Sequence, residues 1–254
     1  AAGAWRLARR GVLLRNLGAL EALGSVTTLC LDKTGTLTEN AMTVRAIELP
    51  GRALEVSGQG WRPRGELLLE GRAVAVEEVP GLGALLTASQ LCNDAVLEEE
   101  AGRWHIHGDP SEGALLVAGA KAGLADPRPA CARLRVLEPG AGQPWMVTVT
   151  RGADGAVSAW MKGAPERVLE RCSAQLGEQG TLPLDEPLRA GWLERNARLA
   201  DAALRVLGVA RKALPEEWGE ADLEQGWQWL GLVGMSDPPR GGVKAVLAEA
   251  HAAG

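Results

Sequence analysis

Residues 25–38 read Ser-Val-Thr-Thr-Leu-Cys-Leu-Asp-Lys-Thr-Gly-Thr-Leu-Thr, a β-prone apolar run that leads directly into a polar loop. The apolar run predicts a short buried strand over residues 25–31, with Asp32 at its carboxyl end. Ligands of open α/β sheets bind at the carboxyl ends of the strands. We therefore expect an α/β fold with a ligand-binding site that includes Asp32.

The loop after this strand carries groups suited to phosphoryl transfer. The Asp32 carboxylate is a reasonable nucleophile, and its attack on a phosphoryl group would give an acyl phosphate. Gly35 permits a tight turn that brings backbone N–H groups to a phosphate, and Thr36 adds a hydroxyl donor. Mg²⁺ prefers oxygen ligands and bridging phosphate, so the Asp32 carboxylate and the Thr34 carbonyl are its expected ligands. The alternative is a solvated turn, which the full run Asp32–Thr38 disfavours.

Composition sets limits on the class of protein. The chain has 254 residues, of which 46% are hydrophobic and 23% charged, as in ordinary soluble proteins. Its net charge of -5 gives no support for nucleic-acid binding, and no apolar run approaches the roughly 20 residues that cross a bilayer. The four cysteines lack metal-ligand spacing, which predicts buried or half-buried thiols.

Periodicity and turn residues predict the remaining elements. Helices are expected over residues 5–22, 81–101, 111–122, 164–174, 186–203 and from 241 onward. Strands are expected within 44–66 and over 145–150, 156–161, 204–211 and 228–235. The mixture of strands and helices predicts at least one mainly parallel sheet.

The run Asp32–Thr38 resembles the phosphorylation signature of P-type ATPases, which belong to the haloacid-dehalogenase-like superfamily. The resemblance covers nearly the whole chain, because further blocks match in order: Leu91-Cys-Asn-Asp-Ala95, Gly108-Asp-Pro-Ser-Glu-Gly-Ala-Leu115, Lys162-Gly-Ala-Pro-Glu166, Arg205-Val-Leu207 and Met235-Ser-Asp-Pro-Pro-Arg240. Residues 56–65 resemble calcium-type (type II-like) pumps, with Trp61 where a Tyr is usual. This favours an alkali or alkaline-earth cation over a heavy metal and leaves the ion itself open.

The resemblance implies two domains. Residues 1–43 and 231–254 would form an incomplete haloacid-dehalogenase-like, Rossmann-like phosphorylation domain, and residues 44–230 an inserted α/β nucleotide-binding domain. Domain closure would bring the γ-phosphoryl group of ATP to Asp32. The implied function is ATP binding and formation of an aspartyl phosphate in an ATP-driven cation pump. Thr34 stands where phosphatases of the superfamily carry a second Asp as general acid and base, so the aspartyl phosphate should persist.

Matching motif positions imply the nucleotide contacts. Glu112 would accept from the adenine amino group, Lys162 would act as a point charge toward phosphate or adenine, and Arg205 would reach phosphate oxygens. Thr34 would contact the transferred phosphoryl group. The alternatives are a first-turn helix carboxylate, a surface lysine and a strand-end arginine. The chain has no Phe to stack on adenine, so Trp145 is the candidate ring, and the expected affinity for ATP is submillimolar at best.

Several parts of the family do not occur in this sequence, including its later Thr-Gly-Asp and Gly-Asp-Gly-x-x-Asn-Asp segments, its actuator domain and its transmembrane helices. We therefore expect a cytoplasmic segment of a cell-membrane pump, inactive in transport by itself. Its partners would be ATP, Mg²⁺, the transported metal cation and the actuator domain. Two alternatives stay open: a soluble haloacid-dehalogenase-like phosphatase, and a non-catalytic nucleotide-binding module with a vestigial Asp32.

Overall fold

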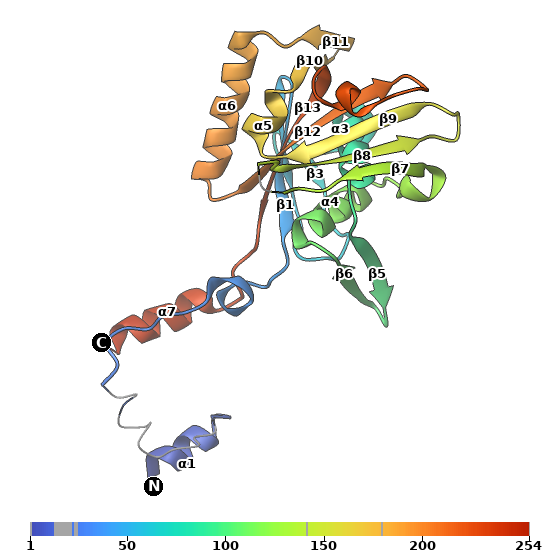
Figure 1. Ribbon diagram of the computed structural model, residues 1–254. Coiled ribbons are helices and arrows are strands. Elements are labelled where there is room, and N and C mark those ends of the chain that lie inside the picture. Colours follow the sequence, from blue (N-terminus) through green and yellow to red (C-terminus); the bar gives the residue numbers. More distant parts are fainter. Residues whose placement is uncertain (1, 13–21, 23–24, 141, 179, 254) are drawn as a thin grey trace. The chain divides into compact units, whose positions relative to one another are not determined.

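The computed structural model describes residues 2–12, 22, 25–140, 142–178 and 180–253 (Figure 1). The chain divides into two compact units: Asn40–Pro238 form the larger one, and Ala1–Glu39 with Pro239–Gly254 form the smaller one. Residues 231–236, which the sequence analysis placed with residues 1–43, continue a strand of the larger unit. The assignment of a phosphorylation and a nucleotide-binding role to the two units stays a prediction.

The larger unit is built on an 11-stranded sheet. Its strand order is β4 (Arg72–Val74), β3 (Leu67–Leu69), β2 (Arg52–Val56), β1 (Thr43–Leu49), β13 (Trp227–Ser236), β12 (Arg205–Leu214), β9 (Val157–Gly163), β8 (Trp145–Arg151) and β7 (Ala132–Leu137). Off this path, β10 (Cys172–Gly177) pairs with β13 and with β11 (Gly180–Pro183).

The prediction of a mainly parallel sheet is wrong. Among the described strands only β10 and β13 pair in parallel, and the other pairs are antiparallel. Consecutive strands such as β1 and β2, or β8 and β9, are joined by short turns, and a parallel pair would instead need a crossover of a dozen or more residues. The fold is therefore an α/β arrangement dominated by an antiparallel sheet.

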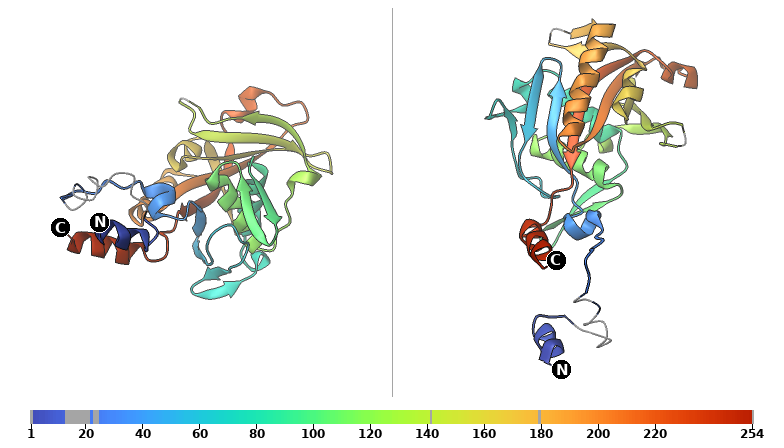
Figure 2. Two further views of the ribbon diagram at one scale, coloured as in Figure 1. Left: turned by 90° about the horizontal axis from the view of Figure 1, so that it is seen from below. Right: turned by 90° about the vertical axis from the view of Figure 1, so that its left-hand side faces the viewer.

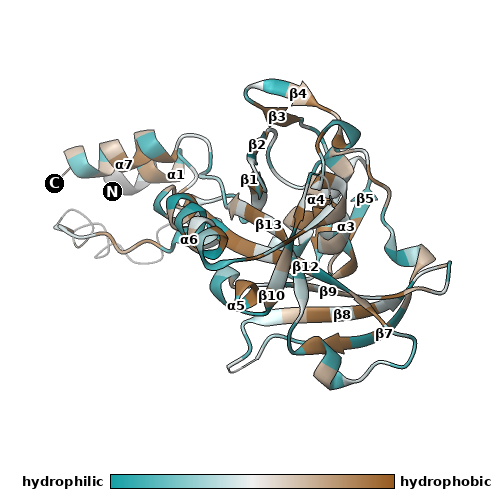
Figure 3. Ribbon diagram, turned by 90° about the horizontal axis from the view of Figure 1, so that it is seen from above, coloured by the Kyte–Doolittle hydropathy of each residue, from teal (hydrophilic) through white to brown (hydrophobic). Residues whose placement is uncertain are grey.

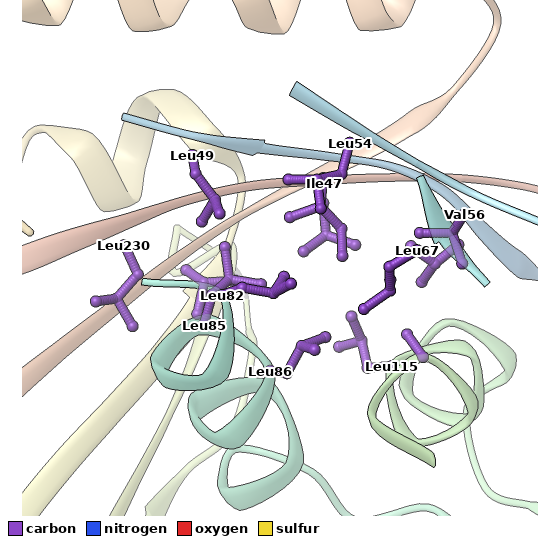
Figure 4. Packing of buried hydrophobic residues seen from close by; sticks show 14 of the residues in the cluster. Ile47, Leu49, Leu54, Val56, Leu67, Leu82, Leu85, Leu86, Leu115 and Leu230 are labelled. Atoms are coloured by element: carbon purple, nitrogen blue, oxygen red, sulfur yellow. The ribbon is translucent and has the colours of Figure 1, made fainter. Parts of the chain in front are cut away.

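Helices cover both faces of this sheet. The helices α3 (Leu82–Leu91) and α4 (Pro110–Lys121) pack on one face, where leucines of both helices meet strands β1 and β2 (Figure 4). On the other face, α5 (Pro165–Leu169) and α6 (Glu186–Asp201) pack through a second cluster (Figure 2, right). Only Trp192 and Leu199 of α6 are buried, and most of this helix is hydrophilic, whereas β8 is hydrophobic (Figure 3).

The sequence pattern predicted some of the other elements correctly and made two helices too long. The structure confirms the predicted helices over 111–122 and 186–203, as α4 and α6, and the predicted strands at β8, β9, β12 and β13. The predicted helix over 81–101 ends at Leu91, and β5 (Val96–Glu100) pairs with β6 (Arg103–His107) through a turn with positive φ at both central residues. The predicted helix over 164–174 ends at Leu169 because β10 follows. The remaining short helical turns are η2 (Val76–Glu78), η3 (Arg128–Ala130) and η4 (Glu220–Leu223).

The smaller unit contains α1 (Ala2–Ala8), the turn η1 (Lys33–Leu37) and α7 (Val243–Ala252), which confirms the helix predicted from residue 241. The strand predicted over residues 25–31 is wrong, because these residues are exposed and irregular. No described strand lies in this unit to pair with them, and an isolated extended segment leaves its backbone groups to water. Most of the helix predicted over 5–22 lies outside the described residues. No helix in the described part of the chain is long and apolar enough to cross a bilayer.

Gly231 gives a direct test of the central pairing of β13 with β1. Its φ is +150°, and a Cβ atom there would lie 2.2 Å from the Glu48 carbonyl oxygen. Gly231→Ala should therefore lower the free energy of unfolding by about 2 kcal/mol or more. Gly191→Ala is the matched control, because Gly191 lies within α6 and an added Cβ would meet no atom within 4 Å apart from those of its own helix turn; it should raise stability by about 0.5 kcal/mol. Urea unfolding measures both, and equal effects would contradict this account.

Candidate functional site

A cavity of about 600 Å³ lies in the larger unit and is lined by Glu112, Lys162 and Arg205, the three residues singled out there by the sequence. They come from three separate elements: the first turn of α4, the end of β9 and the start of β12. The volume falls within the roughly 300–1,000 Å³ of ordinary small-molecule pockets. The structure thus brings the three residues to one cavity, and what they bind there stays a prediction.

The start of α4 is set by Asp109. Its carboxylate oxygen accepts hydrogen bonds from the backbone N–H groups of Ser111, at 2.7 Å, and Glu112, at 3.2 Å. Pro110 then occupies the first helical position, where its missing N–H costs nothing. Glu112 consequently lies in the first turn, where a negative charge is favoured by the exposed N–H groups of the helix.

The Glu112 carboxylate is largely engaged by the protein itself. Its Oε1 accepts from Lys162 Nζ at 2.6 Å, and its Oε2 accepts from the backbone N–H groups of Asp94, at 2.7 Å, and Ala95, at 3.1 Å. A carboxylate offers about four acceptor positions, so roughly one is left for a ligand. Glu112 therefore holds the loop that follows α3 against the cavity, in addition to any contact it makes with a ligand.

Lys162 is not the surface lysine that the alternative interpretation supposed. Its side chain is only 8% exposed, and Nζ donates to the Cys92 carbonyl oxygen as well as to Glu112. An ammonium group has three N–H donors, so one remains for a ligand. Burial raises the pKa of the adjacent Cys92 thiol, an effect that the Lys162 charge opposes, so this cysteine stays protonated and unreactive.

Asn93 is a site residue that the sequence analysis missed. It is 1% exposed; its Nδ2 donates to the Glu112 carbonyl oxygen at 2.9 Å and its Oδ1 accepts from the Ala95 N–H at 2.9 Å. Arg128 holds the same loop by donating to the Ala95 carbonyl oxygen at 2.7 Å. The available signal was its place in the matching block Leu91-Cys-Asn-Asp-Ala95, although the predicted helix over 81–101 hid the loop to which it belongs. Asn93 positions Glu112 and acts through it.

Arg205 and Trp145 complete the cavity wall. Arg205 is exposed, and no hydrogen bond or ion pair with the described residues engages its guanidinium group. Trp145 is half-buried, and the Arg171 guanidinium lies 3.7 Å from the centre of its ring, so one ring face is already covered. The cavity thus offers one free guanidinium, one remaining N–H of Lys162 and an indole side chain.

Asp32 and Thr34 lie in the smaller unit, and both are exposed. The turn that follows Asp32 is closed by Thr38, whose hydroxyl accepts from the Gly35 N–H at 3.1 Å, and Arg240 donates to the Gly35 carbonyl oxygen at 2.8 Å. Gly35 has φ of +78°, as a tight turn requires. Within the described residues no group of three His, Cys, Asp or Glu side chains could hold a metal ion. Magnesium binding by Asp32 and Thr34 stays a prediction.

Breaking the ion pair between Glu112 and Lys162 should cause a large loss of stability. Glu112→Ala leaves the buried Lys162 charge without its partner, which should cost about 3 kcal/mol or more in urea unfolding. The matched control is Arg135→Ala, which breaks the exposed pair with Glu220 at 2.8 Å and should cost less than about 1 kcal/mol. Losses of equal size would show that Lys162 finds water or another partner when Glu112 is removed.

Comparison with known proteins identifies the family of the chain. Residues 81–242, which carry α4, β8, β9 and β12 of the cavity wall, match the family model described as "P-type ATPase, cytoplasmic domain N". This match covers more than half of the chain, and the chain therefore belongs to the P-type ATPase cytoplasmic domain N family.

Similar proteins extend the match to the whole chain. The cation-transporting ATPase pma1 of Synechocystis sp. is 39% identical over 100% of this chain and 29% of its own length. The probable cation-transporting ATPase F of Mycobacterium tuberculosis is 39% identical over 100% of the chain and 28% of its length. The human calcium-transporting ATPase type 2C member 1 is 34% identical over 100% of the chain and 27% of its length. The chain thus spans less than a third of these relatives.

Proposed function

We propose that this chain is the ATP-binding and phosphoryl-accepting region of an ATP-driven cation pump. The observation that carries the proposal is the convergence of Glu112, Lys162 and Arg205 on one cavity of about 600 Å³. These residues lie far apart in the sequence, and each comes from a block that resembles P-type ATPases. Family membership supports the proposal, because the relatives are named cation-transporting and calcium-transporting ATPases.

The nucleotide would be held mainly by cations. The free guanidinium of Arg205 can donate two parallel hydrogen bonds to phosphate oxygens. The remaining N–H of Lys162 lies deeper in the wall and is suited to a base nitrogen or an α-phosphate oxygen. Glu112 keeps about one acceptor position for the adenine amino group. Trp145 would supply an apolar contact for the base, and because Arg171 already covers one ring face, we expect modest affinity.

Asp32 would accept the phosphoryl group. In this proposal residues 1–43 and 231–254 are part of a haloacid-dehalogenase-like phosphorylation domain, and residues 44–230 are the nucleotide-binding domain. A carboxylate oxygen of Asp32 attacks the γ-phosphorus, the bond to the bridging oxygen breaks, and ADP leaves with that electron pair. Mg²⁺, held by Asp32, the Thr34 carbonyl and phosphate oxygens, would neutralise part of the phosphate charge. Thr34 supplies no acid or base for hydrolysis, so the acyl phosphate persists.

The whole protein would be a membrane pump with this region in the cytoplasm. The type 2C relative is named for calcium, which supports an alkaline-earth cation as cargo. A soluble phosphatase is disfavoured by Thr34 and by family membership. A non-catalytic nucleotide-binding module with a vestigial Asp32 is the remaining alternative, and the two experiments below separate nucleotide binding from phosphoryl acceptance.

Nucleotide binding is tested by titration calorimetry on this chain. Arg205→Gln should weaken ATP binding about tenfold, roughly 1.4 kcal/mol, and leave adenosine binding unchanged, because only phosphate contacts are lost. Arg64→Gln is the matched control, since it removes the same charge from an exposed residue outside the cavity. Chelation of Mg²⁺ should have little effect, and AMP should bind within about tenfold of ATP. Equal losses in both arginine variants, or binding that requires Mg²⁺, would contradict the proposed site.

Phosphoryl acceptance is tested in the full-length protein. Asp32→Asn removes the nucleophile but keeps the shape of the exposed side chain, so acid-stable label from γ-labelled ATP should disappear while folding is retained. Glu39→Gln, which alters another exposed carboxylate of the same unit, should still be labelled. Label that persists in Asp32→Asn would reject Asp32 as the acceptor, and nucleotide binding without label in the unaltered protein would favour the non-catalytic module.

A further inference from the structure

A second cavity, of about 420 Å³, opens on the same sheet of the larger unit. It shares β9 and β12 with the first cavity but lies toward their other ends, where it is lined by Ser158 and Trp160 of β9 and by Arg211 of β12. Arg205 and Arg211 are six residues apart on one strand, which corresponds to about 20 Å. The two cavities therefore use different residues, and the second is not part of the proposed nucleotide site.

Arg211 carries a positive charge that the described part of the protein does not neutralise. Its Nε donates to Gln228 Oε1 at 2.7 Å, and its two terminal nitrogens make no hydrogen bond or ion pair with described residues. Among the described residues, no Asp or Glu lines the cavity. Arg211 is half-buried, and this burial lowers its pKa. A half-buried cation without a counter-ion costs free energy that an anionic ligand would recover.

Lys212 also contributes to the lining of this cavity, but as the neighbour of Arg211 on β12 its side chain points to the opposite face of the sheet. Its Nζ donates to the carbonyl oxygens of Asp222 and Gln225, the latter at 2.8 Å, so the ammonium is held in place without being neutralised. The chain as a whole carries a net charge of -5. The charge in the cavity is therefore that of Arg211, and because no carboxylate among the described lining residues offsets it, its local field favours anions.

The guanidinium group of Arg211 is also held in one orientation. Arg211 faces Trp160 across one ladder and Gln228 across the other, so the three side chains form a row over three neighbouring strands. The Gln228 amide is itself fixed, because its Nε2 donates to Thr181 Oγ1 at 2.6 Å, and Trp160 Nε1 donates to Thr150 Oγ1 at 2.8 Å. A fork that is already oriented loses little conformational entropy when it binds a ligand.

We propose that the cavity at Arg211 binds a small oxyanion, a carboxylate or a phosphate, on the two terminal nitrogens of this guanidinium group. The planar fork matches two oxygens of either group. The hydroxyl groups of Ser158 and Thr181 line the same cavity and can donate to a further oxygen. The volume suits a metabolite-sized ligand and lies within the usual range for such sites.

The test is a titration of this chain with inorganic phosphate and, separately, with malonate, followed by site-resolved ¹H–¹⁵N NMR. The Trp160 indole N–H and the Gln228 side-chain amide report on the second cavity, and the backbone N–H groups of Glu112 and Lys162 report separately on the first. At least one anion should shift the Trp160 and Gln228 resonances saturably. Saturation by phosphate alone identifies a phosphate ligand, and saturation by malonate alone identifies a carboxylate.

Three variants make the result specific to Arg211. Arg211→Gln should abolish the saturable shift, and Arg211→Lys, which keeps the charge but loses the fork, should weaken binding about fivefold or more. Arg64→Gln removes the same charge from an exposed position away from the cavity and should bind as the unaltered chain does. Shifts that stay linear for both anions, or saturable shifts that survive Arg211→Gln, would overturn the proposal. Loss of nucleotide binding in the first cavity would leave it unaffected.

Discussion

The ion pair between Lys162 and Glu112 joins the parts of the larger unit on which the candidate site depends. It links the end of β9 to the first turn of α4, and the same two side chains bind the loop after α3 through the Cys92 carbonyl oxygen and the Asp94 and Ala95 N–H groups. Both side chains are largely buried, so removing either one would leave the charge of the other without a partner, at a high cost in folding free energy. The shape of the cavity therefore depends on the same contacts that hold α4 and the loop after α3 on the sheet.

The antiparallel ladder of β9 and β12 explains why one sheet face can carry two polar cavities. Side chains alternate along a strand, so residues an even number of positions apart share a face. Arg205, Val209 and Arg211 consequently line up on β12, with Val209 in the hydrophobic cluster beneath α3 and α4 and an arginine toward each end. Hydrophobic packing in the middle of the strand fixes the backbone from which the two arginine side chains extend.

The smaller unit contrasts with this. Its loop is organised by local hydrogen bonds around Thr38 and Gly35, with one cross-link from Arg240, and the Asp32 side chain stays exposed. Ser25 to Leu31 have strong strand propensity, yet no described strand of this unit lies beside them, and they are irregular. Residues with strand propensity form a strand only where neighbouring strands bind their backbone N–H and C=O groups. This explains why β8 and β9 were predicted correctly and this segment was not.

The sequence by itself determined the elements with strong local signals, such as the helices α4 and α6, which the structure shows to be capped by Asp109 and Asp185, and the hairpin of β8 and β9 around its Ala-Asp-Gly turn. It also indicated Glu112, Lys162 and Arg205, three of the residues that line the first cavity. Only the tertiary structure decided that the sheet is antiparallel, that Glu112 is mostly engaged by Lys162, and that Arg211 has no counter-ion among the described residues. The physical reason is that capping and turn formation depend on neighbours in the sequence, whereas pairing, burial and charge compensation depend on residues such as Glu112 and Lys162, which lie 50 positions apart.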